Sequence, residues 1–187
     1  MATDISICSS ALVMAGADAI TGWGDDTREA EVAKQLYEDA VRDLLTDYPW
    51  RFSMGKVQLA RLADAPLEGY DYAYQLPGDA LSVISVEGSR SPYEVFGDKL
   101  YCDDAEVKVN YQFRPLEARF PAYFTATLIL KLAALFSLAL LKDESISDKW
   151  EARAGVKLAV AKARDSQTQR SGKPYAGQYH LVASRQG

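Results

Sequence analysis

Few side chains in this sequence could carry out catalysis or bind a metal ion. The chain has a single histidine, His180, and two cysteines, Cys8 and Cys102. One histidine cannot build a two-histidine metal site, and two cysteines so far apart match neither a disulfide framework nor a zinc-ligand spacing. A nucleophile pair of Cys8 and His180 would depend entirely on folding, because no local motif supports it. The low cysteine content favours a reducing compartment.

Carboxylates and glycines make no stronger case for an active site. The pairs Asp25-Asp26 and Asp103-Asp104 are typical of turns and helix caps, and the acidic spacings match no calcium loop. Gly22-Trp23-Gly24 follows a predicted helix and lacks the third glycine of a dinucleotide-binding loop. A glycosidase-type carboxylate pair is neither excluded nor supported. The sequence therefore predicts no enzyme, no metal site and no cofactor.

The composition is that of a soluble globular protein. The 187 residues are 48% hydrophobic and 25% charged, which suits one domain with a sizeable core and room for an inserted subdomain. The net charge of −5 argues against a protein that wraps DNA. The first residues include the acidic Asp4 and no basic segment before an apolar run, so no signal peptide is predicted. The apolar run 124–141 approaches the length of a membrane span, but Lys131 at its middle favours a helix buried in a bundle, so no membrane is expected.

Four segments have the hydrophobic pattern of helices, and these must position any functional side chain. The second has a continuous apolar stripe that ends at Tyr48. The first three expected helical ranges are 4–15, 26–48 and 121–142. The fourth is expected to begin at Ser145 or Ser147 and to end at about residue 169. Charged residues are expected on the outward positions of the fourth helix, namely Lys149, Glu151, Arg153, Lys157, Lys162, Arg164 and Asp165.

Between the second and third helices the pattern changes to short β-branched runs. Gly97-Asp98 separates two of them and suits a tight hairpin turn. The predicted strands are Lys56–Ala60, Tyr72–Leu76, Leu81–Val86, Tyr93–Phe96, Lys99–Cys102 and Val107–Phe113. The expected fold is α+β: a four-helix bundle with a small antiparallel β insert between helices 2 and 3, and an extended C-terminal arm. The expected divisions are 1–52, 53–120, 121–169 and 170–187.

The last 18 residues differ from the rest in charge. Residues 170–187 contain three basic residues and no acidic one, so the tail carries a charge of +3. The rest of the chain contains 18 basic and 26 acidic residues, so the body carries about −8. A basic, aromatic segment without helical periodicity is either disordered or ordered by a partner. The residues we expect to dock on a partner are Arg170, Lys173, Tyr175, Tyr179, His180, Leu181 and Arg185.

Two segments of the body combine aromatic residues with proline. In Tyr48-Pro49-Trp50-Arg51-Phe52 the proline must end the second helix, and the aromatic rings are expected to pack around the break. In residues 74–81, Tyr74 and Leu76 share one face of a strand that Pro77 ends. We expect Tyr48, Pro49, Trp50 and Phe52, with Tyr74, Leu76 and Pro77, to form a structural junction between helices and strands.

Together these segments resemble the head–tail adaptor proteins of tailed bacteriophages, also called head-completion or connector proteins and including tail tubular protein A. Residues 37–52 fit the pattern YxxxxxxLLxxYPWxF of that family, and residues 74–81 fit its pattern YxLPxDxL. The resemblance is good over residues 5–86, and beyond them it extends only to the order of the elements. Ser82 stands where relatives often have an arginine, and the short predicted insert favours a compact adaptor ring over a tail-tube β domain.

The resemblance implies a structural role in the virion. Such proteins form an oligomeric ring, commonly of twelve copies, at the neck between the portal protein and a tail, nozzle or tail-completion protein. Genomic DNA passes through the ring without sequence-specific binding, and a terminal arm often docks on the portal. The protein would be made in the cytoplasm of the bacterial host.

Two other classes of function stay open at this point. A DNA-binding regulator would need a basic recognition helix, for which the fourth helix is the candidate despite its mixed charges. A phage hydrolase acting on cell wall or nucleic acid is the enzymatic alternative.

Overall fold

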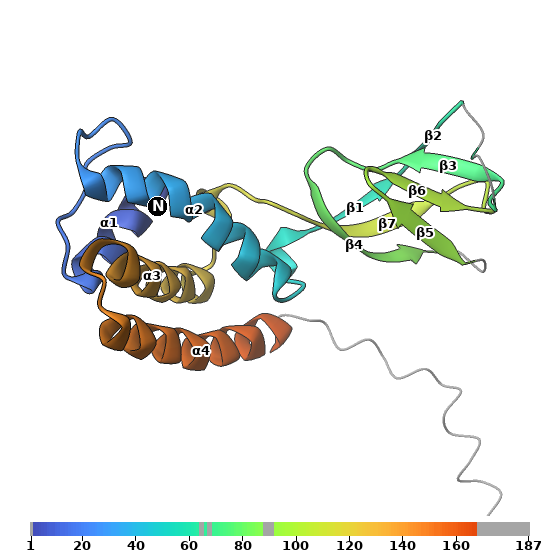
Figure 1. The fold of residues 1–187 in the computed structure, drawn as a ribbon. Helices are drawn as coiled ribbons and strands as arrows, with labels where there is room; N and C mark the ends of the chain where they lie inside the picture. Colours follow the sequence, from blue (N-terminus) through green and yellow to red (C-terminus); the bar gives the residue numbers. More distant parts are fainter. Residues whose placement is uncertain (1, 64–65, 67–68, 88–91, 168–187) are drawn as a thin grey trace, which may run out of the picture.

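The computed structural model describes residues 2–63, 66, 69–87 and 92–167. The chain forms a helical unit and a β unit that lie end to end (Figure 1). The helices are α1 (Asp4–Ala15), α2 (Arg28–Thr46), α3 (Ala122–Phe136) and α4 (Glu144–Gln167). Short 3-10 helices cover Arg51–Ser53 and Glu117–Arg119, and a π-helical turn over Ser137–Leu141 extends α3.

In the helical unit, α3 contacts each of the other three helices. The first helix starts at a capping box, in which Thr3 and Ser6 satisfy each other's main-chain N–H. Gly16, with φ of 92°, ends it in the left-handed conformation that glycine tolerates. Thr27 caps α2 by accepting from the N–H of Ala30.

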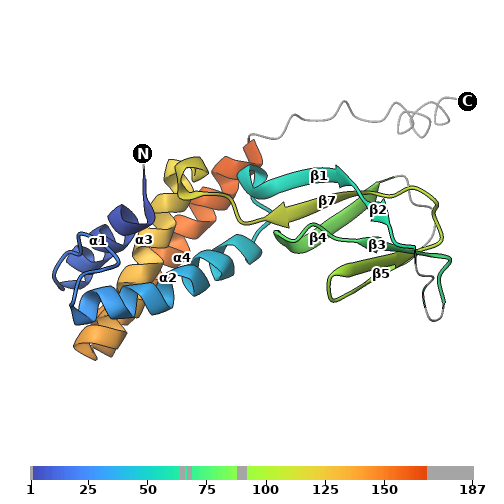
Figure 2. The ribbon, with the colours of Figure 1, turned by 90° about the horizontal axis from the view of Figure 1, so that it is seen from above.

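Within the described residues the β unit contains seven strands in two antiparallel sheets. The strands are β1 (Met54–Gln58), β2 (Ala60–Arg61), β3 (Tyr72–Gln75), β4 (Ala80–Glu87), β5 (Tyr93–Phe96), β6 (Lys99–Cys102) and β7 (Lys108–Phe113). One sheet has the order β1-β7-β4 and the other β2-β3-β6-β5, and the view from above shows β7 between β1 and β4 (Figure 2). Seven buried residues form a core of its own for this unit: Leu59, Tyr74, Leu76, Leu100, Cys102, Val107 and Val109.

The expectation of a helical bundle with a small β insert is therefore wrong. Residues 56–60, predicted as one strand, belong to two sheets: β1 ends at Gln58, β2 begins at Ala60, and buried Leu59 turns the chain between them. The N–H of Leu59 donates to Val107 O at 2.9 Å, which continues the pairing of β1 with β7 by one residue before the chain enters the other sheet. The local pattern missed this because it shows strand tendency but not which distant strand will pair.

The apolar segment Ala122–Leu141 is, among the described residues, the one helical run long and apolar enough to cross a membrane, with a mean hydropathy of 2.1. Close to half of it is buried, and α3 packs against three helices in the manner of a core helix. Lys131, near its middle, forms an ion pair with Asp43 of α2.

Candidate functional site

No arrangement for metal-binding or nucleophilic catalysis emerges from the residues that the structure describes. They contain no group of three or more His, Cys, Asp or Glu side chains placed to hold a metal ion. Cys8 is fully buried, and burial raises the pKa of its thiol to about 12. Burial also raises the pKa of Cys102. Since a thiol must ionise to act as a nucleophile, neither cysteine is suited to that role.

The best-defined polar and aromatic assembly lies where α2 meets the β unit, at the Tyr48–Phe52 segment. Trp50 is fully buried, and its ring lies 5.0 Å from that of Tyr48 and 5.3 Å from that of Phe124 in edge-on contacts. The ring of Phe52 is 4.8 Å from that of Phe124. The aromatic cluster thus fixes the end of α2 against α3.

The break at Pro49 leaves two helix carbonyls that need new donors. The helical partner of Leu45 O would be the N–H of residue 49, which proline does not have. Nε2 of Gln112, on β7, donates to Leu45 O at 2.6 Å instead. The indole Nε1 of Trp50 donates to Leu44 O at 2.8 Å. Side chains from both units therefore satisfy the end of α2, which a buried helix terminus requires.

Gln112 links the two units through further hydrogen bonds besides the one to Leu45 O. It is 2% exposed, and its amide also donates to Tyr48 O at 2.9 Å and to Ser53 Oγ at 3.1 Å. A side-chain amide carries two hydrogens, so these three acceptors share two donors. The amide holds β7, and with it the β unit, against the end of α2.

Asp165 connects the same junction to the last helix. It is buried, its Oδ2 accepts from the main-chain N–H of Arg51 at 3.0 Å, and its Oδ1 accepts from the Tyr123 hydroxyl at 2.6 Å. Burial and the neighbouring Asp165 carboxylate raise the pKa of Tyr123, so the hydroxyl stays a donor at neutral pH. The predicted outward position of Asp165 on the fourth helix is wrong. Asp165 lies on the buried face of α4, together with Ala154 and Ala161.

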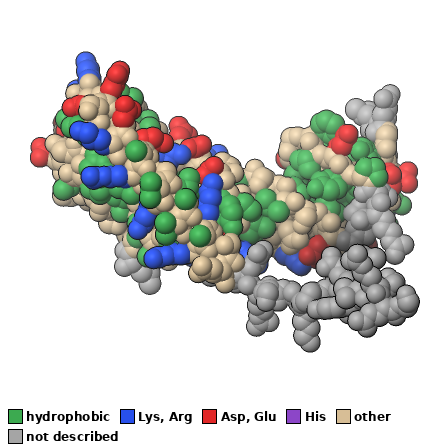
Figure 3. Space-filling view, turned by 90° about the horizontal axis from the view of Figure 1, so that it is seen from below, with side chains coloured by type: hydrophobic (Ala, Val, Ile, Leu, Met, Phe, Trp, Pro, Cys, Tyr) green, Lys and Arg blue, Asp and Glu red, His purple; other side chains and the backbone are tan. Residues whose placement is uncertain are grey.

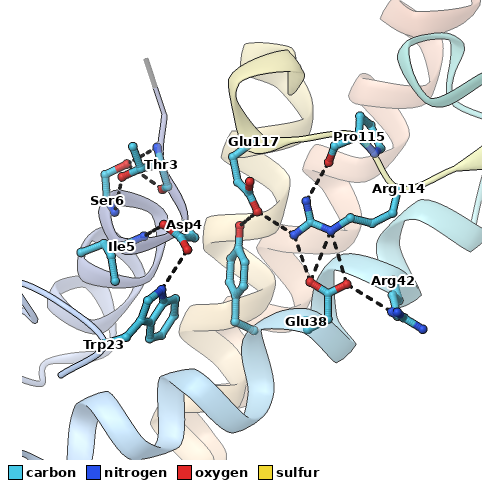
Figure 4. Close-up of polar contacts among 11 residues, drawn as sticks. Thr3, Asp4, Ile5, Ser6, Trp23, Glu38, Arg42, Arg114, Pro115 and Glu117 are labelled. Atoms are coloured by element: carbon cyan, nitrogen blue, oxygen red, sulfur yellow. Dashed lines mark hydrogen bonds and ion pairs between the residues drawn. The ribbon is translucent and has the colours of Figure 1, made fainter. Parts of the chain in front are cut away.

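A second polar network joins α2 to the segment that leads from β7 into α3 (Figure 4). The Arg114 guanidinium contacts Glu38 at 3.0 Å and Glu117 at 2.6 Å, and Tyr37 donates to Glu117 at 3.1 Å. Although partial burial works against the charged form of Glu38, hydrogen bonds from Arg114 and Arg42 lower its pKa. This bidentate arrangement fixes the direction in which the chain leaves the β unit.

A cleft with a volume of about 540 Å³ opens beside the junction. Its walls include the motif residues Tyr48 and Pro49, the Lys56–Glu87 ion pair at 2.5 Å, and Ser166 near the end of α4. The cleft therefore lies between the last turn of α4 and the β1-β7-β4 sheet.

The two motifs lie in different cores. Trp50 belongs to the helical core, whereas Tyr74 and Leu76 belong to the core of the β unit. The Tyr74 hydroxyl donates to Asp104 O at 2.5 Å, and the N–H of Ala80 closes a turn onto Pro77 O at 3.0 Å. The first motif builds the junction, and the second builds the interior of the β unit.

The predicted docking residues Arg170, Lys173, Tyr175, Tyr179, His180, Leu181 and Arg185 lie outside the described residues. The pattern-based reasoning also missed Gln112, Asp165 and the Arg114 network. Of these, Asp165 had a usable signal, since it falls at helical spacing from the apolar residues of α4.

Comparison with known proteins supplies no relative: no protein family matches the chain, and no curated protein is significantly similar to it.

Proposed function

We propose that this protein is a head–tail adaptor of a tailed bacteriophage. In this proposal it is a structural virion protein without enzymatic activity. Copies of it, twelve in the usual arrangement, form a ring at the neck of the virion, between the portal protein and a tail, nozzle or tail-completion protein. The ring assembles from protein made in the host cytoplasm.

One observation carries the proposal: the YPW segment, on which the resemblance mainly depends, builds the joint between two separately packed units. Pro49 ends α2, Trp50 closes one open carbonyl, and Gln112 of β7 closes the other. An adaptor must hold two different partners in a fixed relation. A joint of this kind, with an independent core on either side, suits that task.

The charge distribution is compatible with a DNA conduit. Residues 1–169 carry about −8, so they would repel rather than grip phosphates, and DNA could pass without specific binding. The basic tail, 170–187, is the proposed arm that docks on the portal protein. The helix α4, which ends at Gln167, would deliver the arm from the side of the junction.

The proposal can be tested with the portal protein encoded by the same genome. Full-length protein and a variant that lacks residues 170–187 are each mixed with portal rings and examined by negative-stain microscopy and co-sedimentation. The full chain should add a ring-shaped layer to the portal, and the truncated chain should remain folded but not dock. Normal docking of the truncated chain would contradict the arm. Failure of the folded full chain to bind portal rings would contradict the adaptor function.

A further inference from the structure

Helix α4 exposes an apolar ridge to solvent. Three of its 24 residues are buried, Ala154, Ala161 and Asp165, and they lie on its inward face. On the opposite face Val156 is 71% exposed and Val160 44% exposed. The complete ridge consists of Ala152, Val156, Ala159, Val160 and Ala163. Since a surface helix normally turns polar residues to water, a helix that is apolar on both faces indicates a covered surface.

The ridge continues onto α3 and is bordered by positive charge. A shallow groove of about 400 Å³ is lined by Leu130 of α3 together with Arg153, Val156 and Lys157. The space-filling view shows hydrophobic and basic side chains interleaved over the helical unit on this side (Figure 3). A partner for this surface would therefore need opposite charge as well as a face that a helix can approach closely.

The basic residues form a row along α4: Lys149, Arg153, Lys157 and Arg164. Within the described part of the chain none of the four takes part in an ion pair, and Arg153 lies over the ring of Trp150 at 4.8 Å. Residues 149–164 contain five basic residues and one acidic residue, Glu151. The row spans about 22 Å at the rise of an α-helix.

A row of opposite charge runs along α2 and its C-terminal end: Glu31, Asp39, Asp43 and Asp47. It spans about 24 Å, so its length matches that of the basic row. Asp43 and Asp47 already pair with Lys131 and Lys162, but their side chains remain 66% and 42% exposed. A carboxylate has lone pairs for more than one donor, so both can accept a second cation.

The basic residues of α2 do not cancel this row, because two of the three are bound within the chain. Arg42 pairs with Glu38 at 3.2 Å, and Arg28 donates to Ala139 O at 3.3 Å. Residues 28–47 contain three basic and six acidic residues in all. The exposed side of α2 is therefore acidic.

α3 lies between α2 and α4 along most of their length (Figure 1), and near their C-terminal ends Lys162 of α4 pairs with Asp47 of α2 at 3.0 Å. We infer that copies of this protein associate head to tail, with the apolar and basic face of α4 in one copy packed on the acidic face of α2 in the next. A contact between two different faces generates a ring where the rotation closes. The inference deepens the proposed function and rests on it for ring closure.

Disulfide trapping between two full-length variants tests the contact directly. One variant carries Val156→Cys on α4, and the other carries Gln35→Cys on α2, between Glu31 and Asp39. The native thiols of Cys8 and Cys102 are buried, so they should not compete. Under mild oxidation at low salt, the disulfide between Val156→Cys and Gln35→Cys should form about tenfold faster than the disulfide between Val156→Cys and Ile84→Cys of the β unit. This factor is at the low end of the rate enhancement that electrostatic steering gives.

Charge reversal provides the second arm of the experiment. Adding Arg153→Glu and Lys157→Glu to the α4 variant should remove the rate advantage, and adding Glu31→Lys and Asp39→Lys to the α2 variant should restore it. The matched control reverses Lys108 and Arg119, which lie elsewhere on the surface, and should leave the rate unchanged. Equal rates for all pairs, or disulfides that join Val156→Cys chains mainly to each other, would overturn the inference.

The portal assay separates this inference from the proposed function. Trapped α4–α2 contacts without any binding to portal rings would leave the interface standing and remove the adaptor function. Binding to portal rings as a ring-shaped layer, with no trapping even in that layer, would leave the adaptor function standing and remove the interface.

Discussion

The main-chain N–H of Arg51 donates a 3.0 Å hydrogen bond to Oδ2 of Asp165, a residue 114 positions further along the chain. The other oxygen of this carboxylate accepts from the hydroxyl of Tyr123 on α3. One buried side chain thereby joins the turn after α2 to both helices that follow the β unit. The last helix is held at the junction, and Ser166 in its last turn lines the cleft beside the β unit.

Replacing Asp165 with asparagine should lower the free energy of unfolding by about 1–3 kcal/mol, because only one oxygen then remains to accept from two buried donors. Chemical denaturation measures the change. Asp148→Asn, an exposed change on the same helix, should stay within about 0.5 kcal/mol of the wild type. In a double-mutant cycle, Asp165→Asn and Tyr123→Phe should couple by at least about 0.5 kcal/mol; simple additivity would show that the 2.6 Å contact is not energetically important.

Replacing Gln112 with leucine, which is similar in volume, should cost about 1–3 kcal/mol of unfolding free energy. The carbonyl of Leu45 would then lose its donor in a buried place, and the proline at position 49 cannot replace it, whereas Tyr48 O keeps the N–H of Trp50. Denaturant unfolding measures this loss, and Gln58→Leu on an exposed position of β1 serves as the control. If the two changes had equal effects, the amide would not be what holds the units together.

The helices were readable from the sequence because their signals are local. The apolar stripe of α2, the break at Pro49 and the end of α1 at Gly16 all lie within a few residues of the structure that they predict. The pairing of Met54 with Gln112 is different, since it joins the first and last parts of the β unit in the sequence. No local pattern encodes such a pairing, and for this reason the sequence predicts only a small insert where the structure has two sheets.

The junction was predictable only on one side. The aromatic and proline residues of 48–52 mark the helix end in the sequence, but the partner that completes it, Gln112, is an ordinary polar residue inside a strand. A charged side chain on a helix predicts an outward position for Asp165, because charged residues are seldom buried without a partner. Its partners, Arg51 and Tyr123, are far away in sequence and become neighbours only in the fold.

Stability should depend on pH through Glu38. Hydrogen bonds from Arg114 and Arg42 lower its folded-state pKa below the ordinary value of 4.5. A lowered pKa contributes stability above the unfolded value, and that contribution is lost as the pH falls through the folded value. The difference in unfolding free energy between the wild type and Glu38→Gln should therefore be constant at pH 6–7 and shrink as the pH falls below about 4.5.

A non-titrating change on the same helix controls for general acid effects in that experiment. Gln35→Ala should shift the unfolding free energy by a constant amount at every pH. Denaturant melts at a series of pH values give both comparisons. A Glu38→Gln difference that grew as the pH fell would mean that the carboxylate is destabilised, not stabilised, by its surroundings in the fold.

Trp50 is the residue of the YPW segment whose role in packing can be measured most directly. It is fully buried, its ring contacts Tyr48 and Phe124, and its indole N–H satisfies Leu44 O. Trp50→Ala should therefore cost about 3–5 kcal/mol, the range for removing a large aromatic side chain from a core. Trp50→Phe keeps a ring but loses the hydrogen bond to Leu44, so it should cost less than the alanine change. A loss under about 1 kcal/mol for Trp50→Ala in denaturant melts would mean that the ring is exposed in solution, as an interface residue would be, and that the joint is held by Gln112 and Asp165 alone.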